Sequence, residues 1–304
     1  MCSYKITIKD IETFISDCSA SSNDNYEPYF DDENEPNISL PETSPAILHN
    51  TGIDLLIDTD ALSLYLFEHT HGLIGCCSTF SYCQDDGDAI YEISVLISPE
   101  YRRHGLGRML VSQVLSLIEK NAAVSGAIQA SSDANRQNTD NINVLLVGSN
   151  ESFAGCCGFS YSHSEHFMTR KPYAELSDRR VNTVSANNLT KNAEPGNDKP
   201  EYRIIRNLDR SSGFHTYRLL SRSTRISRCS VVECSDYINI ANVYTAPKYR
   251  GHRFAGRLID TVGADFPQKK LLLQVSGSNT AAIHAYTEAG FTFLKSIDYY
   301  SVNR

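Results

Sequence analysis

Two short segments rich in arginine, glycine and histidine could bind an anion. Residues 102–107 read RRHGLG, and residues 250–255, which begin 148 positions later, read RGHRFA. Each segment follows an apolar run that ends in Pro-x-Tyr, and each precedes an amphipathic pattern of helical period. Free N–H groups at the start of a helix attract anions, small residues let the backbone approach a phosphate, and arginines add positive charge. The repeat therefore predicts two phosphate-binding loops that arose by duplication; the alternative is a tight turn with surface arginines.

Strands and helices alternate around these segments. Periodicity predicts helices over 4–20, from about 107, over 255–262 and over 280–289. Apolar runs predict strands at 54–58, 62–67, 71–81, 89–98, 142–148 and from 158 in the first half, and at 217–220, 227–233, 238–245, 270–275 and 291–297 in the second. This alternation predicts a layered fold of the α/β or α+β class.

The length of 304 residues suggests two domains. Residues 171–200 are rich in Pro, Asn, Ser and Thr and lack an apolar period, so we expect them to form a linker. The expected domains are residues 1–170, with an acidic loop at 19–45, and residues 201–304.

Charge and composition exclude several classes of protein. Residues 1–50 carry ten acidic and two basic residues, which accounts for the whole net charge of −8. A chain that is not basic is not expected to bind nucleic acid, and no apolar stretch reaches the ~18–20 residues of a membrane span. The N-terminus lacks the apolar core of a signal peptide. The acidic stretch 24–42 either attracts a positively charged, amine-bearing molecule or is a solvated loop.

The nine cysteines show neither zinc-ligand spacing nor a disulfide framework. We therefore expect no metal, a reducing compartment and a cytoplasmic location.

The two segments resemble the Arg/Gln-x-x-Gly-x-Gly/Ala signature of the GNAT acyltransferases, whose loop binds the pyrophosphate of acetyl-CoA. Residues 102–107 match fully, whereas Arg253 stands in the place of the first small residue of the second copy. The resemblance covers about 89–162 and 201–300, so the chain looks like a tandem GNAT protein. It implies that each domain has a central mixed, mostly antiparallel sheet flanked by helices. It also implies that acetyl-CoA is bound by Arg102, Arg103, His104, Gly105, Leu106, Gly107 and Arg108 in the first half, and by Arg250, Gly251, His252, Arg253, Phe254 and Ala255 in the second.

In this family the strand before the loop splays from its neighbour, and its free backbone groups bind the pantetheine and the acyl carbonyl. By position, these residues would be Leu96 and Ile97 in the first half, and Val243, Tyr244 and Thr245 in the second.

The resemblance also suggests catalytic residues. Tyr286 resembles the general acid that protonates the departing thiolate, and a phenol of pKa ~10 is protonated at neutral pH. Asn279 resembles the residue that contacts the pantetheine arm, although an asparagine before a helix is also a favoured N-cap. In the first half Ala154 stands where Tyr286 stands in the second. Glu92 lies where many GNATs place a base that takes the amine proton through water. In the second half Ile240 occupies the matching place, and Glu233, Asp236 and Asn239 are nearby options.

Together these features predict an N-acetyltransferase that uses acetyl-CoA and a small-molecule amine or protein amino group, by direct attack in a ternary complex. We expect the second half to catalyse and the first half to bind acetyl-CoA or to be structural, in a monomer or homodimer. The alternative is a non-catalytic acyl-CoA-binding or interaction protein with degenerate domains. A nucleotide-binding protein is disfavoured, because the Walker and Rossmann glycine patterns are missing from the sequence.

Overall fold

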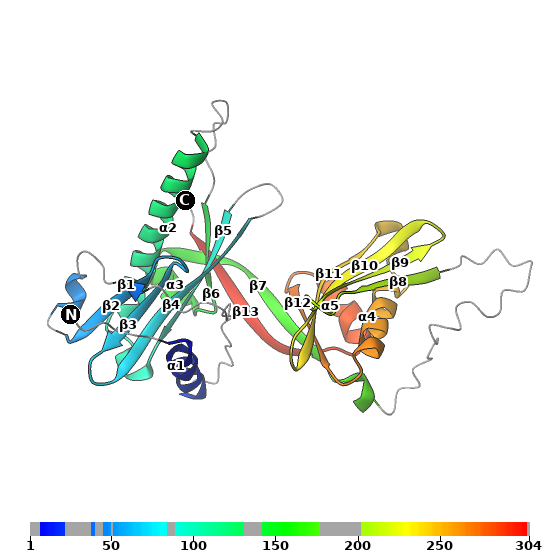
Figure 1. The fold of residues 1–304 in the computed structure, drawn as a ribbon, viewed down its shortest axis with the longest axis horizontal. Helices are drawn as coiled ribbons and strands as arrows, with labels where there is room; N and C mark the ends of the chain where they lie inside the picture. The colour runs from blue at the N-terminus through cyan, green and yellow to red at the C-terminus, as the bar shows by residue number, and fades with distance from the viewer. Residues whose placement is uncertain are drawn as a thin grey trace, which may run out of the picture. The chain divides into compact units, whose positions relative to one another are not determined.

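The computed structural model describes residues 7–21, 38–39, 45–49, 51–83, 89–130, 142–176 and 202–302. The chain forms two compact units (Figure 1). Unit 1 comprises Met1–Ser162 and Asp298–Arg304, and unit 2 comprises His163–Ile297. The expected acidic stretch 24–42 lies almost entirely outside the described residues, and so does most of the expected linker.

Unit 1 is built on a mixed sheet. Its strands are β1 (Ile38–Ser39), β2 (Ile53–Asp58), β3 (Ser63–Glu68), β4 (Gly72–Cys83), β5 (Ala89–Ile97) and β6 (Ile142–Val147). Strands β1 to β5 pair in order and antiparallel, and β6 lies parallel to β5. The helices of this unit are α1 (Ile8–Ser21), α2 (Leu106–Ala130) and α3 (Glu151–Cys156).

Helices cover both faces of the unit 1 sheet. Residues of β3 alternate between two cores, as a pleated strand buried on both sides requires. Leu64 and Leu66 pack in the larger core together with α2. Tyr65 belongs to a second core, where α1 contributes Ile11 and Phe14.

Unit 2 repeats this plan. Strands β8 (Tyr202–Leu208), β9 (Phe214–Ser221), β10 (Thr224–Glu233) and β11 (Tyr237–Thr245) pair antiparallel, and β12 (Lys270–Ser276) lies parallel to β11. Helices α4 (Phe254–Asp265) and α5 (Thr280–Glu288) pack on one face of this sheet. The sequence pattern does not predict β8, because its side chains are mostly exposed and show little apolar alternation.

One core supports unit 2. Tyr217, Leu219 and Cys229 point from the sheet into the core formed with α4 and α5. The neighbouring residues of the same strands, such as Thr216, Arg218 and Arg228, occupy the opposite face. Within the part of the chain that the structure describes, no helix of unit 2 covers that second face.

The two units exchange strands. β7 (Phe159–Arg170) starts in unit 1, but its residues 165–170 pair antiparallel with β12 of unit 2. β13 (Thr292–Val302) starts in unit 2, but its residues 299–301 pair antiparallel with β6 of unit 1. The units therefore differ from the expected domains 1–170 and 201–304, because each sheet takes a strand from the other half of the sequence.

The strand exchange is held by side chains within each unit. The Arg170 guanidinium, which is 5% exposed, donates to Asp260 of α4 at 2.8 Å. In unit 1, Tyr300 is buried in the main core. Residues 173–175, at the start of the expected linker, form a short 3-10 turn that bonds to Pro267 of unit 2. A folded turn replaces the expected linker there because Tyr173 packs against Gly263 of α4.

The layered α+β class with mixed sheets and flanking helices is confirmed. None of the helices in the described ranges is both long enough and apolar enough to cross a membrane.

Candidate functional site

The two signature loops have the same backbone conformation. In the first loop Arg103 and Gly105 have positive φ angles of 65° and 81°. The matching positions of the second loop, Gly251 and Arg253, have φ angles of 77° and 61°. Arg253 thus adopts the left-handed conformation that glycine takes in the other copy, so the departure from the signature does not change the loop.

Each loop is anchored by its leading arginine. The Arg102 Nε donates to the Ile97 carbonyl at 2.9 Å, and the Arg250 Nε donates to the Thr245 carbonyl at 3.1 Å. A 3-10 turn precedes each of them, Pro99–Tyr101 and Pro247–Tyr249. The first arginine of each copy therefore ties the end of the strand to the start of the loop.

The backbone N–H groups that follow each anchoring arginine have no hydrogen-bond acceptor in the described chain. Helices α2 and α4 begin at Leu106 and Phe254, and the first donors bonded to the loops are the N–H groups of Met109 and Arg257. The N–H groups of residues 103–108 and 251–256 remain available for an anion. The arginine and histidine side chains of both loops are exposed around them.

The strand before each loop separates from its parallel neighbour. β5 pairs with β6 only from Ala89 to Ile93, and β11 pairs with β12 only from Tyr237 to Ile240. The expected acyl-binding residues lie beyond these points, where the edge facing the neighbouring parallel strand is unpaired: Leu96, Ile97, Val243, Tyr244 and Thr245.

A β-bulge lies at the split in unit 2. The register between β10 and β11 shifts between Arg228 and Ser230, and Asn242 has a φ of 52°. The fully buried Ser227 secures the end of β11, because its hydroxyl donates to the Tyr244 carbonyl and contacts the Thr245 hydroxyl, both at 2.9 Å. This role of Ser227 could not be predicted from the sequence, since a lone serine in a strand carries no signal.

Tyr286 lies on α5 in the core of unit 2. It is 8% exposed, and burial, followed by the nearby Cys229, raises the pKa of its phenol. Its hydroxyl has no hydrogen bond to any described residue and is not sealed from solvent. A protonated phenol with a free O–H can donate to an incoming group.

Asn279 is the N-cap of α5, and its side chain accepts from the Ala282 N–H at 3.1 Å. Asn150 caps α3 of unit 1 in the same way, through the Phe153 N–H. The Asn279 amide group still has its N–H₂ donors for another partner.

Unit 1 differs where unit 2 has Tyr286. Ala154 is fully buried in α3. The preceding Phe153 places its ring against Gly107, so that a Cβ on Gly107 would lie 3.0 Å from the ring. Phe153 and Ile97 thus both lie against Gly107 near the start of α2 in unit 1.

The candidate carboxylates lie in different units. Glu92, on β5 of unit 1, accepts from the Tyr82 hydroxyl at 3.0 Å. In unit 2, Glu233 pairs with Lys269 at 2.8 Å and His215 at 3.3 Å, and Lys269 is the main cause of its lowered pKa. Glu92 and Tyr286 are therefore not part of one unit's site.

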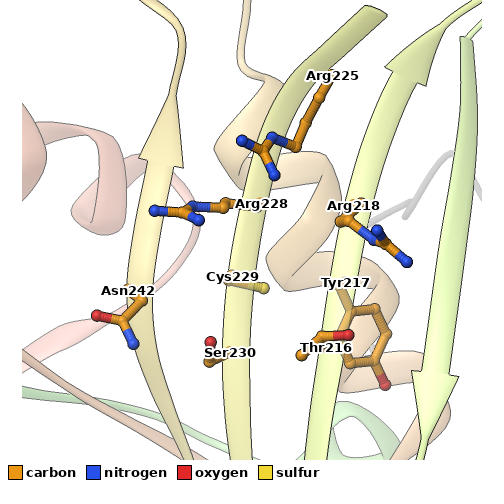
Figure 2. Close-up of a pocket in the computed structure, with 8 residues that line it drawn as sticks. All are labelled: Thr216, Tyr217, Arg218, Arg225, Arg228, Cys229, Ser230 and Asn242. Carbon is orange, nitrogen blue, oxygen red and sulfur yellow. The ribbon is translucent and has the colours of Figure 1, made fainter. Parts of the chain in front are cut away.

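A cavity of about 430 Å³ opens beside the β11 bulge, on unit 2 (Figure 2). Its polar lining comes from three neighbouring strands: Thr216 and Arg218 of β9, Arg225, Arg228 and Ser230 of β10, and Asn242 of β11. Tyr217 and Cys229 also border it, but they belong to the core on the other face of the sheet, where burial raises the pKa of the Cys229 thiol to about 12. The sequence does not reveal this cavity, because its residues are scattered over three strands.

Comparisons with known proteins agree with this geometry. The model of the acetyltransferase (GNAT) family matches residues 24–144 and 192–291. Among curated proteins, none is significantly similar to the chain. Three solved structures are given as examples of the similarity. Their sequence identities to the chain are too low to support more than a shared fold.

A GCN5-related N-acetyltransferase from Sphaerobacter thermophilus is 12% identical, with a TM-score of 0.59, over 96% of this chain and 90% of that one. A glucosamine N-acetyltransferase region of a fungal multi-domain β-N-acetylglucosaminidase is 12% identical, with a TM-score of 0.52, over 79% of this chain and 32% of that one. A tandem GNAT protein from the clavulanic acid biosynthesis pathway is 14% identical, with a TM-score of 0.49, over 83% of both chains.

The split strands and repeated loops define an acyltransferase fold of the GNAT type. The chain belongs to the GNAT acetyltransferase family and carries two GNAT regions in tandem.

Proposed function

We propose that this protein is an N-acetyltransferase that uses acetyl-CoA, and that unit 2 carries out the reaction. The observation that carries the proposal is the combination, in one unit, of an anion-binding loop, a split strand pair and the free hydroxyl of Tyr286. These parts have separate tasks in acyl transfer: holding the phosphates, stabilising the oxyanion and protonating the leaving group.

The residues fit acetyl-CoA as a substrate. The unbonded N–H groups of residues 251–256 and the exposed side chains of Arg250, His252 and Arg253 suit a pyrophosphate. Beyond Ile240, the free edge of β11 offers backbone groups to the pantetheine and the acetyl carbonyl. We assign the same binding role in unit 1 to the 102–108 loop, with Leu96 and Ile97.

In the reaction, an acceptor amine attacks the acetyl carbonyl carbon, so that a C–N bond forms and the C–S bond breaks. In the segment Val243, Tyr244 and Thr245, the backbone N–H groups that face the open edge of β11 stabilise the charge that develops on the carbonyl oxygen. Tyr286 donates its phenolic proton to the departing sulfur, and Asn279 helps to hold the pantetheine arm. The raised pKa of Tyr286 keeps this proton in place at neutral pH.

The amine must also lose a proton. Glu92 holds the position of such a base, acting through a water molecule, but it lies in unit 1, to which we assign no catalysis. In unit 2, Ile240 occupies the corresponding place. An amine that arrives uncharged can release its proton directly to water after the attack. We therefore assign no side chain as the base of unit 2.

Unit 1 either binds acetyl-CoA or supports the structure. Ala154 in place of the tyrosine, and Phe153 packed against Gly107, favour this limited role over catalysis.

Seven of the described cysteines are free thiols, which supports a cytoplasmic location: Cys18, Cys76, Cys77, Cys156, Cys157, Cys229 and Cys234. No cluster able to hold a metal ion occurs among the described His, Cys, Asp and Glu side chains.

Replacing Tyr286 with phenylalanine tests the proposal. The phenyl ring keeps the packing against Phe291 but cannot donate a proton. We expect kcat to fall by ~10-fold or more, because a positioned acid typically contributes about 10²–10⁴-fold. An acceptor screen with acetyl-CoA and detection of the free thiol of CoA supplies the assay.

Tyr249→Phe is the matched control, because Tyr249 packs on Phe254 within unit 2 but lies outside α5. CoA binding, measured by calorimetry, should be unchanged in both variants. A Tyr286→Phe protein with the full kcat would rule out the acid role, and a wild-type protein that acetylates no amine would favour a binding protein.

A further inference from the structure

The cavity of unit 2 occupies a place that α1 covers in unit 1. In unit 1, Tyr65, Cys76 and Leu96 pair across β3, β4 and β5 and form an apolar row under α1. In unit 2, the residues at the same register are Arg218, Arg228 and Tyr244. The correspondence is fixed by the anchor arginines, because Leu96 and Tyr244 each precede the residue whose carbonyl accepts from Arg102 or Arg250.

Two arginines have thus replaced an apolar pair. Arg218 and Arg228 stand directly opposite each other on β9 and β10, an arrangement in which like charges destabilise a sheet. Arg228 lies over the Tyr244 ring, 5.7 Å from its centre. None of the three arginines of the cavity forms an ion pair with a carboxylate of the described chain. An anion bound between them would remove the repulsion.

The cavity also lies beside the reaction centre that we propose. It is bounded by Asn242 at the bulge of β11, and the next residues, Val243 to Thr245, form the expected acyl-binding edge. Thr216 and Ser230 add hydroxyl groups to the same cavity.

We infer that the cavity lined by Arg218, Arg225 and Arg228 binds an anionic group of the acceptor, so that the acceptor is a small amine that carries a carboxylate or a phosphate. That the bound molecule is an acceptor rests on the proposed acetyltransferase function. Anion binding in the cavity can be tested without measuring any turnover. The arginine cavity favours an anionic group on the acceptor, whereas the acidic stretch 24–42 could attract a cationic acceptor.

The binding test compares the wild type, the double variant Arg218→Gln/Arg228→Gln and the control Arg210→Gln. Arg210 is an exposed arginine outside the cavity lining. The melting temperature is measured with and without two probes, citrate for the carboxylate and inorganic phosphate for the phosphate. Both probes can also bind the signature loops, so the informative quantity is the part of the thermal shift that the double variant loses.

We expect at least one probe to stabilise the wild type and the control equally, and to stabilise the double variant distinctly less. The probe that loses its effect identifies the anion. Equal shifts in the double variant and the wild type would overturn the site. Melting without probe checks the fold, and the double variant should be at least as stable as the wild type because it lacks the repulsive pair.

The activity test uses acceptors that differ only in the anionic group, glucosamine 6-phosphate against glucosamine and an amino acid against its amide. We expect kcat/KM to be at least about 10-fold higher for the anionic member of one pair. The double variant should lose this preference and keep the KM for acetyl-CoA.

Equal use of both members of each pair would overturn the acceptor assignment. A wild type that acetylates none of the four compounds or a wider amine panel would count against the proposed function, and the thermal shifts would then decide the anion site alone.

Discussion

Single residues decide how closely the two copies of the signature resemble each other. Arg253 holds a left-handed backbone conformation in the place of Gly105, which costs a residue with a Cβ about 1–3 kcal/mol. The rest of unit 2 offsets this strain, and the arginine adds a positive side chain to the loop. Strain at such a position is typical of a functional loop.

Gly107 provides a prediction at this scale. An alanine Cβ there would lie 3.0 Å from the Phe153 ring, so we expect Gly107→Ala to lower the free energy of unfolding by about 1–3 kcal/mol through overpacking. Thermal and denaturant melting measure this loss.

Ala255→Gly is the matched control, because it makes the second loop like the first without adding an atom, and it should cost no more than about 1 kcal/mol. An undisturbed Gly107→Ala protein would show that Phe153 moves freely and does not fill the site of unit 1.

The helix starts after the loops and the capping role of Asn279 could be predicted from the sequence, because they depend on residues close together in the chain. The hydrogen bonds from Arg102 and Arg250 to the strand ends were not predicted, because the sequence does not show which way a side chain turns. The arginine cavity could not be predicted, since only the register between β9, β10 and β11 brings its residues together.

At the scale of elements, the same strand–loop–helix arrangement occurs in both units, but the elements around it differ. In unit 1 the face opposite α2 is covered by α1. In unit 2, α5 is a full nine-residue helix that carries Tyr286, whereas α3 has six residues. Alternation along the sequence predicted most strands, but it could not show that β7 and β13 divide their residues between the units, because strand partners are long-range contacts.

The ion pair between β7 and α4 makes this division testable. Asp260 is the partner of the buried Arg170 guanidinium, so we expect Asp260→Ala to cost about 1–3 kcal/mol of stability, because it leaves the arginine without its charged partner. Melting of the full chain measures this loss.

Asp260→Asn keeps a hydrogen-bond acceptor and should lose less. The neighbouring helix residue Thr261, whose hydroxyl bonds only back to the Arg257 carbonyl of the same helix, supplies a control, Thr261→Ala, with little effect expected. An Asp260→Ala protein as stable as that control would mean that β7 is held in unit 2 by its backbone pairing alone.

At the scale of the whole molecule, neither half of the sequence contains all the strands of its own sheet. β6 takes its outer neighbour from residues 299–301, and β12 takes its neighbour from residues 165–170. Duplication explains the two similar units, but the exchanged strands make them interdependent.

Shortening the chain tests this dependence. Removing residues 298–304 leaves the edge of β6 unpaired and takes the buried Tyr299 and Tyr300 from unit 1. We expect unit 1 to lose about 3–5 kcal/mol, the usual cost of deleting a buried aromatic side chain. Hydrogen exchange should show faster exchange of the β6 amides, whereas those of β9 and β10 should keep their protection.

Removing only residues 303–304, which follow β13, is the control and should change neither region. Unchanged protection of β6 in the longer deletion would argue against the exchange.

The exchange also bears on how the chain is made. A ribosome releases the N-terminal residues first, and domains commonly fold as they emerge. Unit 1 cannot do so fully, because the strand beside β6 follows the whole of unit 2 in the sequence. Its sheet keeps an open edge, a surface prone to mispairing, until all of unit 2 has been synthesised. Unit 1 is therefore begun before unit 2 but completed after it.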